Sequence, residues 1–398
     1  MPVDQCPLCG GAEFAPLNQY GPRCLVGDYH ITTGHVENVW CRRCGGGWNR
    51  LMMADADLAA FYAGYTKKTA SSEEDDLLFG TDEAEVETLT DSQARFLASH
   101  VHDADGRVLD VGCGKGSFLR GFARLHPSWR CVGVEPSREE ADLARQGGGI
   151  QVVEGMFGSV ALEPGSFDLV AIMHVLEHVS RPVETLRELH RLLRPGGRVF
   201  IEVPNPCDLN MFYDLLLFEH LHHFTPETLA WLATRERFEV VAHERSTSYG
   251  AQRLIARTLP AAPVHAAWPP LTMAAGLAAW TDLWRQMTEL ADRAAAEAAA
   301  GRRVAIFGAG MTAATWLVYT ALHDARLVGL FDESPWKIGR TLFDRPVHAL
   351  ADIREHAPDV ILIATMPNSQ RRVADKLATA CDRSTEIRGF VPVEGARR

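Results

Sequence analysis

Short apolar runs alternate with amphipathic stretches through the middle of the chain, and this alternation indicates strands that alternate with helices. The apolar runs predict strands at residues 107–111, 131–135, 150–153, 167–173, 198–203, 238–243 and 254–257. Helical spacing predicts helices at residues 117–125, 138–146 and 182–193. Such an order is typical of a mostly parallel sheet with helices on both faces, so we predict an α/β fold.

A second, shorter series follows an alanine-rich stretch. Residues 271–300 have a helical pattern rich in alanine, which predicts a helix that connects two domains. Beyond it, strands are predicted from residue 303 and at 327–331 and 359–364. We therefore expect a smaller doubly wound domain at the C-terminal end.

Length and charge narrow the classes of function. A chain of 398 residues suggests two or three domains, at about 150 residues each. Hydrophobic residues make up 46% and charged residues 23%, the balance of a globular protein. The net charge of -11 and the lack of a Lys/Arg cluster disfavour nucleic acid as a partner. Without a signal peptide or an apolar run of about 18 residues, we expect a cytoplasmic protein with no membrane partner.

Four of the nine cysteines form two pairs, Cys6-Pro-Leu-Cys9 and Cys41-Arg-Arg-Cys44, each followed by glycine. Two such pairs place four thiolates around one tetrahedral Zn²⁺, and the glycines permit the tight turns. In a reducing compartment, clustered cysteines favour metal binding over disulfides. We therefore predict a zinc site formed by Cys6, Cys9, Cys41 and Cys44, the alternative being four thiols without a metal.

A glycine-rich turn follows the first strand of the central domain, in Val108-Leu-Asp-Val-Gly-Cys-Gly-Lys-Gly116. Glycines at this point let the backbone approach a ligand closely before the helix begins. Glu135 ends the next strand, where a carboxylate accepts hydrogen bonds from ribose hydroxyls. A dinucleotide and S-adenosylmethionine both fit this pattern, but Asp110 favours the second, because its carboxylate repels a pyrophosphate and suits an amino-acid end.

The segment resembles the first motif of class I methyltransferases. The resemblance continues through Glu135, through residues 167–178 and into Leu193-Arg-Pro-Gly-Gly-Arg-Val199. It implies a Rossmann-like domain that binds S-adenosylmethionine, with a non-catalytic copy of the fold as the alternative. By that resemblance, Asp110, Gly112 and Gly114 contact the methionine part of the donor, and Glu135 contacts its ribose. Met156 lies near the adenine, and His174 faces the sulfonium end.

Candidate acceptor chemistry lies after the fifth strand, in Phe218-Glu-His-Leu-His-His-Phe-Thr225. Histidine removes protons near neutral pH, and an adjacent carboxylate raises its basicity or fixes its tautomer. His220 is the predicted base and Glu219 its neighbour. The alternative is a helix start at Thr225-Pro226 around which these histidines merely pack.

The three parts together resemble the nucleotide-sugar C-methyltransferases, which methylate a ring carbon of deoxy-4-keto sugars. The resemblance rests on the cysteine pairs, on Glu219-His220, on Tyr249-Gly-Ala-Gln-Arg253 and on residues 331–339. It implies that His220 removes a proton next to a ketone and that the enolate carbon then takes the methyl group. The oxyanion then needs a hydrogen-bond donor, for which the candidates are His178, His223 and Tyr65.

Departures from that family keep other acceptors open. Leu217 stands where the family has Tyr, and Tyr249 and Ala251 replace a Gly and a Ser. An O- or N-methyltransferase of another natural-product pathway is one alternative. An NAD-dependent oxidoreductase, using Gly308-Ala-Gly310 and Asp332, is another. The C-terminal domain is expected to hold the substrate, with Lys337 near a phosphate, or else to be purely structural.

These observations predict four segments in order along the chain. They are a zinc-binding module at 1–60, a methyltransferase domain at 61–260, a helical linker at 261–300 and a Rossmann-like domain at 301–398. The expected partner is a small molecule, and the resemblance implies a nucleotide-sugar as one candidate.

Overall fold

The computed structural model describes residues 2–65, 78–79, 87–261 and 267–391. The chain forms two compact units, and each draws on separated stretches of sequence. Unit 1 comprises Met1–Asn18, Glu37–Asp208 and His220–Ala274, and unit 2 comprises Gln19–Val36, Leu209–Glu219 and Ala275–Arg398. Part of the expected linker, 262–266, lies outside the described residues. The four segment limits expected from the sequence stay predictions.

Unit 1 is built on a seven-stranded sheet. Its strands lie in the order β10 (Ile150–Glu154), β9 (Trp129–Glu135), β8 (Gly106–Val111), β11 (Phe167–Met173), β12 (Leu193–Pro204), β15 (Ala251–Thr258) and β14 (Phe238–Glu244). The pairs from β10 to β12 are parallel, whereas β15 runs antiparallel to both of its neighbours. From β8 the chain continues to β9 and β10 on one side of this strand, and it then returns to the other side of β8 as β11. Ligands of such sheets bind at the carboxyl ends of the strands at this reversal.

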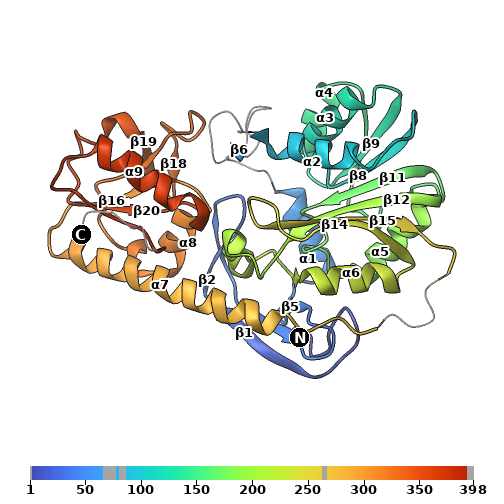
Figure 1. The fold of residues 1–398 in the computed structure, drawn as a ribbon, viewed down its shortest axis with the longest axis horizontal. Helices are drawn as coiled ribbons and strands as arrows, with labels where there is room; N and C mark the ends of the chain where they lie inside the picture. The colour runs from blue at the N-terminus through green and yellow to red at the C-terminus, as the bar shows by residue number, and fades with distance from the viewer. Residues whose placement is uncertain (1, 66–77, 80–86, 262–266, 392–398) are drawn as a thin grey trace. The chain divides into compact units, whose positions relative to one another are not determined.

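Alternate residues of these strands face two separate cores. Val108, Leu169 and Phe200 pack on one face together with residues of α2 (Leu89–Ala98) and α3 (Ser117–Leu125). On the other face, Leu109 and Val170 pack together with residues of α5 (Pro182–Leu192) and α6 (Pro226–Arg235). Figure 1 shows these helix pairs on opposite sides of the sheet, with α4 (Arg138–Gln146) beside α3. The expected α/β alternation is confirmed.

Small sheets and a short helix precede this domain. One sheet has the order β1 (Phe14–Tyr20), β4 (Val36–Cys41), β5 (Gly47–Asn49) and β13 (His222–His223). Strands β2 (Arg23–Leu25) and β3 (Ile31–Thr33) form a hairpin, and β6 (Leu78–Phe79) pairs with β7 (Glu87–Thr88). Helix α1 spans Asp55–Ala63. Because β13 pairs with β5, the segment just after His220 is fixed to the cysteine-bearing sheet.

Unit 2 contains a six-stranded sheet. Its order is β18 (Thr341–Leu342), β19 (Arg345–Ala349), β17 (Gly329–Asp332), β16 (Val304–Phe307), β20 (Val360–Ile363) and β21 (Glu386–Arg388). The helices are α7 (Met273–Ala299), α8 (Met311–Tyr319) and α9 (Gln370–Ala380), with shorter turns η2 (Leu209–Leu216), η3 (Ala321–His323), η4 (Leu350–Asp352) and η5 (Pro367–Ser369). The second, smaller α/β series is therefore confirmed.

Unit 2 also gathers two segments that precede α7 in the sequence. Leu25 of the hairpin and Leu217 pack with Ala314 and Val318 of α8. The Tyr319 hydroxyl donates to the Leu216 carbonyl at 2.7 Å and accepts from the Leu25 N–H at 2.9 Å. A single phenol thus fixes both segments to the C-terminal fold.

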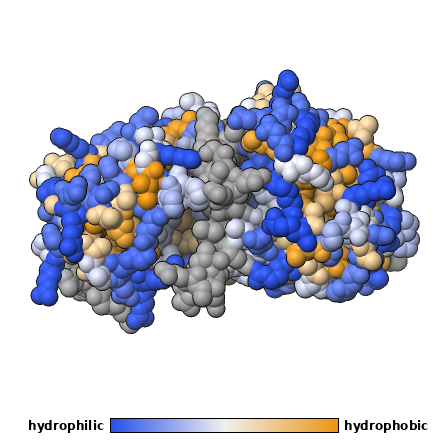
Figure 2. Space-filling view, turned by 90° about the horizontal axis from the view of Figure 1, so that it is seen from above, coloured by the Kyte–Doolittle hydropathy of each residue, from blue (hydrophilic) through white to orange (hydrophobic). Residues whose placement is uncertain are grey.

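The described surface is mixed in character. On the face drawn in Figure 2, hydrophilic residues are interspersed with apolar ones. Among the described helices, none combines the length and the apolar character required to cross a bilayer.

Candidate active site

The glycine-rich turn begins where β8 ends and closes onto α3. Gly112, Gly114 and Gly116 have φ of 72°, 51° and 81°, backbone conformations that side chains disfavour. A Cβ at Gly112 would lie 2.5 Å from Val175 Cγ2. The N–H of Gly112 donates to the Val134 carbonyl at 2.8 Å, which fixes the turn to β9. The turn therefore requires glycine at Gly112, because Val175 occupies the space of a side chain there.

Two buried carboxylates flank this turn. Glu135 accepts hydrogen bonds from the N–H groups of Gly114, at 2.9 Å, and Ser137, at 2.8 Å. Asp110 is 2% exposed, and its Oδ1 has no hydrogen-bond partner among the described residues. Burial, followed by the charge of Glu135, raises the pKa of Asp110 well above its ordinary value. A cationic group placed beside Asp110 would relieve this desolvated charge.

The structure places Met156 and His174 on two loops at the same edge of the sheet. Met156 follows β10, and the N–H of the preceding Gly155 donates to the Glu135 carbonyl at 2.9 Å. His174 follows β11 with φ of 52°, and its N–H donates to the Glu202 carbonyl at 2.8 Å. Both residues therefore lie at the carboxyl ends of strands, as predicted, while their contacts with a donor stay predictions.

His174 is held between two buried carboxylates. Its Nε2 lies 3.1 Å from Glu202 Oε1, and its Nδ1 lies 3.4 Å from Glu177 Oε1. Burial alone would lower the pKa of His174, but hydrogen bonds and charges from Glu177 and Glu202 raise it to about 9. The imidazole is therefore protonated at neutral pH.

Glu202 is the centre of a buried polar network. It is fully buried and accepts hydrogen bonds from Gln93 Nε2 and from Arg253 Nε. The Arg253 guanidinium also lies 3.3 Å from the Tyr249 hydroxyl. Burial would raise the pKa of Glu202, but His174 and Arg253 lower it to about 2. Tyr249 and Arg253 were noted from the sequence, but their partner Glu202 was not. A glutamate inside the apolar strand Phe200-Ile-Glu-Val203 was the feature that could have indicated it.

The predicted base and one predicted donor come together. The rings of His178 and His220 have centroids 4.8 Å apart and meet edge to face at 82°. Tyr62 of α1 also contacts His178 edge to face, with ring centroids 5.8 Å apart. Tyr65 follows Tyr62 at 5.5 Å, so the α1 end lies near this histidine pair.

Glu219 and His223, two other predicted residues, have surroundings that differ from those of the His178–His220 pair. Glu219 belongs to unit 2, where its Oε1 accepts from the Gly27 N–H at 2.7 Å. His223 is 1% exposed in β13 and pairs with Gly47 of β5. The expected helix start after these histidines is present, because Thr225 caps α6 by accepting from the Thr228 N–H at 3.2 Å. Because β13 is a strand of the cysteine-bearing sheet, His223 belongs to that sheet.

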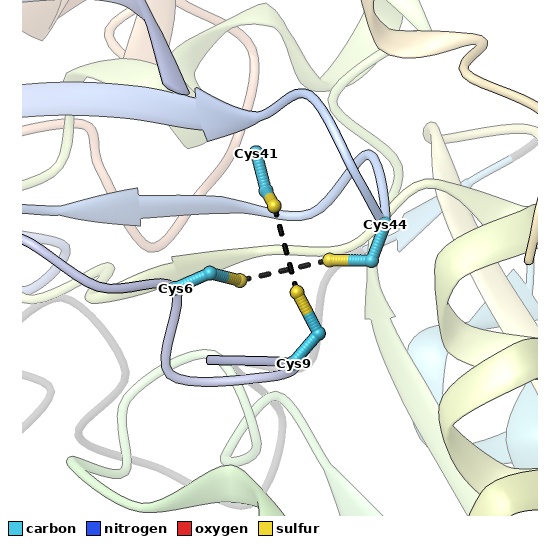
Figure 3. Close-up of side chains that lie close together, drawn as sticks. All are labelled: Cys6, Cys9, Cys41 and Cys44. Carbon is cyan, nitrogen blue, oxygen red and sulfur yellow. Dashed lines mark hydrogen bonds between the residues drawn. The ribbon is translucent and has the colours of Figure 1, made fainter. Parts of the chain in front are cut away.

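The four predicted metal ligands form one cluster. Cys6 Sγ lies 3.6 Å from Cys44 Sγ, and Cys9 Sγ lies 3.6 Å from Cys41 Sγ. Figure 3 shows the four sulfurs pointing toward one another from two loops. A tetrahedral site with Zn–S bonds of about 2.3 Å separates its sulfurs by about 3.8 Å, so the cluster fits this ion. The N–H groups of Gly11 and Arg43 also donate to Cys9 and Cys41, at 3.4 and 3.3 Å.

In unit 2, Asp332, the acid predicted to bind a nucleotide, already accepts hydrogen bonds from the protein itself. Asp332 accepts from the N–H groups of Ala309, Glu333 and Ser334 at 2.7, 2.8 and 2.9 Å. Lys337 Nζ lies 3.1 Å from the same carboxylate. The residues expected to meet a ribose and a phosphate are thus bound to each other.

The comparisons with known proteins agree with this geometry. A family described as "Methyltransferase domain" matches residues 83–243, and one described as "C-methyltransferase C-terminal domain" matches residues 275–392. The chain carries a class I S-adenosylmethionine-dependent methyltransferase domain. The methyltransferase domain includes every predicted donor-binding residue, and the second family covers nearly all of α7 and the fold that follows it.

Two relatives are ubiquinone biosynthesis O-methyltransferases. That of Xanthomonas euvesicatoria pv. vesicatoria is 34% identical over 124 residues, which is 30% of this chain and 52% of the relative. That of Xanthomonas campestris pv. campestris is 33% identical over 158 residues, 35% of this chain and 66% of the relative. The chain thus spans about half to two thirds of the length of these curated relatives.

A solved S-adenosylmethionine-dependent methyltransferase from Mesorhizobium loti is also similar to this chain. It is 19% identical, with a TM-score of 0.37, over 42% of this chain and 99% of that chain. The family matches define the methyltransferase domain here.

Proposed function

We propose that this chain transfers a methyl group from S-adenosylmethionine to a carbon atom of a small molecule, next to a ketone in a nucleotide-linked sugar. The observation that carries the proposal is Asp110, a buried carboxylate beside the Gly112–Gly114 turn whose Oδ1 has no partner among the described residues. Such a group suits the ammonium of a methionine moiety. The name of the family that matches residues 275–392 supports carbon as the acceptor atom.

In this proposal the donor lies along the carboxyl edge of the unit 1 sheet. Asp110, Gly112 and Gly114 bind its methionine part and Glu135 its ribose. Met156 packs at the adenine, and His174, whose positive charge is balanced by Glu177 and Glu202, lies at the sulfonium end. S-adenosylmethionine supplies a methyl group that its sulfonium already activates, so the chain's own residues need only orient the partners and move a proton.

The proton moves to His220. His220 takes the proton from the carbon next to the ketone, and the C–H electron pair forms the enolate. A donor from His178, Tyr65 or His223 stabilises the oxyanion. The enolate carbon then forms the new C–C bond while the methyl–sulfur bond breaks, with its electron pair going to sulfur. The proton on His220 finally passes to solvent.

Isotope labelling tests this chemistry directly. The protein is incubated with a nucleotide-linked 4-keto-deoxysugar and S-adenosylmethionine that carries a deuterated methyl group. We expect a product with the labelled methyl on the carbon next to the ketone. A label on oxygen or nitrogen instead would support the alternative methyltransferases and contradict carbon transfer.

The role of His220 has its own measurement. In deuterated water, the acceptor's α-proton exchanges if a base removes it before methyl transfer. Exchange should be lost in His220→Ala and kept in His102→Ala, a change at an exposed histidine. Exchange at the wild-type rate in His220→Ala would show that another group is the base.

We also propose that Cys6, Cys9, Cys41 and Cys44 bind one structural Zn²⁺. The sulfur spacing and the two N–H donors to sulfur support this. Metal analysis of the purified chain should find about one zinc per chain. Absence of zinc from protein prepared with zinc present would refute the site.

For the C-terminal fold we propose a substrate-holding role at residues 301–398. The saturated Asp332 disfavours the NAD alternative, because this carboxylate already accepts four donors. We expect Lys337→Ala to raise KM for a nucleotide-linked acceptor with kcat unchanged. Saturable quenching on titration with NADH would instead favour the oxidoreductase.

A further inference from the structure

Glu177 is a buried carboxylate that the mechanism above does not use. It follows β11 in unit 1 and is 1% exposed. Its backbone carbonyl accepts the N–H groups of Leu221, at 2.8 Å, and His222, at 3.0 Å. Glu177 therefore fixes the residues directly after His220 to the turn after β11.

The Glu177 side chain reaches the same histidines. One carboxylate oxygen of Glu177 and one ring nitrogen each of His178 and His220 all lie within 4.8 Å of one another. His178 Nε2 is 3.9 Å from Glu177 Oε1, and His174 Nδ1 is 3.4 Å from the same oxygen. One carboxylate thus stands among three imidazoles.

This carboxylate is held in its charged form. Burial would raise the pKa of Glu177, but His174, whose Nδ1 lies 3.4 Å away, and the charges of His178 and His220 lower it below its ordinary value. A buried negative charge acts strongly on its neighbours, because little water screens it. The neighbouring Glu219 instead accepts the Gly27 N–H in unit 2.

We propose that Glu177 is the positioning residue for the His178–His220 pair, and that it supplies the carboxylate which Glu219 was expected to supply. A carboxylate next to an imidazole fixes the tautomer and favours the protonated ring. This inference deepens the proposed function and rests on it for the role of His220. Glu177 acts through His220 and does not itself touch the acceptor.

Histidine titration in the full-length protein tests this without any acceptor. The ring signals of His178 and His220, assigned with His178→Gln and His220→Gln, are followed by NMR in wild type, Glu177→Gln and the exposed control Glu163→Gln. Among the described residues, Glu177 lies beside both rings, His174 shares its carboxylate, and Tyr62 of α1 contacts the ring of His178, with Tyr65 next to Tyr62.

We expect the pair to titrate about one to three pH units lower in Glu177→Gln, the effect of an opposite charge at this range. Glu163→Gln should titrate as wild type does. An unchanged titration in Glu177→Gln would overturn the proposal. Retained binding of S-adenosylmethionine in that variant, measured by calorimetry, shows that the fold is intact.

Exchange of the acceptor's α-proton with solvent distinguishes the role of Glu177 from the proposed function of the chain. With a nucleotide-linked 4-keto-deoxysugar, we expect Glu177→Gln to slow α-proton exchange by about 10- to 100-fold, as loss of an outer partner of a functional histidine does. Exchange at the wild-type rate would contradict the role of Glu177. If wild type itself exchanges nothing, the proposed function fails, whereas the titration still decides the place of Glu177.

Discussion

Replacing His174 with glutamine should remove a pH-dependent part of the stability of unit 1. The ring lies 3.1 Å from Glu202 and 3.4 Å from Glu177, and this environment raises the pKa of His174 from 6.5 to about 9. The rise corresponds to about 3 kcal/mol, at about 1.4 kcal/mol per pH unit. Because the side chain is 27% exposed, water screens part of the interaction, and we expect about 2 kcal/mol.

The direction of the pH dependence follows from the raised pKa of His174. The folded state binds this proton more tightly than the unfolded chain does, so the stabilisation is complete below the unfolded value of 6.5. It is lost progressively as the pH rises through about 9. The difference in unfolding free energy between wild type and His174→Gln should therefore be largest near pH 6 and smallest near pH 10.

Urea unfolding at about pH 6, 8 and 10, followed by tryptophan fluorescence, measures this difference. Two compact units can unfold separately, so the transition compared is the one that S-adenosylmethionine shifts. The control is His102→Gln at an exposed position, which should leave the free energy unchanged at each pH. A difference between wild type and His174→Gln that stays constant or grows with pH would refute the reasoning.

Three further outcomes are expected. Cys44→Ser should lose zinc by metal analysis and unfold at lower temperature, while Cys207→Ser, outside the cluster, should keep its zinc; equal zinc content in both would contradict the site. Arg253→Met should cost about 2–3 kcal/mol in urea unfolding, because Glu202 loses the hydrogen bond from the guanidinium while His174 still faces it; a loss below about 1 kcal/mol would be inconsistent with that pairing. Gly112→Ala should weaken S-adenosylmethionine binding, since φ is 72° there and a Cβ would meet Val175; unchanged affinity by calorimetry would argue against the tight turn.

The strands and helices of both sheets could be predicted because their patterns are local. Alternation of buried residues along β8 and β11 follows from a sheet with a core on each face. Helices α3 and α4 span the predicted residues. By contrast, the packing of Leu25 and Leu217 on α8 joins residues far apart in sequence. No local periodicity marks such contacts, so the discontinuous units could not be predicted.

The donor-binding part of the site could be predicted, because a backbone turn defines it. The histidine cluster was harder to predict, because it depends on where individual side chains point. Asp110 and Glu135 flank the glycine turn because Asp110 is the second-last residue of β8 and Glu135 the last residue of the neighbouring parallel strand β9. Glu219 and His220 are adjacent in sequence, yet Glu219 lies in a turn and His220 directly follows it, so the two side chains have different surroundings. Glu219 accordingly meets Gly27, whereas His220 meets His178 and Glu177.

The most direct test of the central claim is calorimetric titration of the full-length chain with S-adenosylmethionine. We predict saturable binding at about one site per chain, weakened about 10- to 100-fold in Asp110→Ala, the effect of losing a hydrogen bond to a charged group. Asp142→Ala, at a half-exposed carboxylate on α4, should bind as wild type does. Absence of binding heat from the wild-type protein at several temperatures, or equal affinity in Asp110→Ala, would contradict the account.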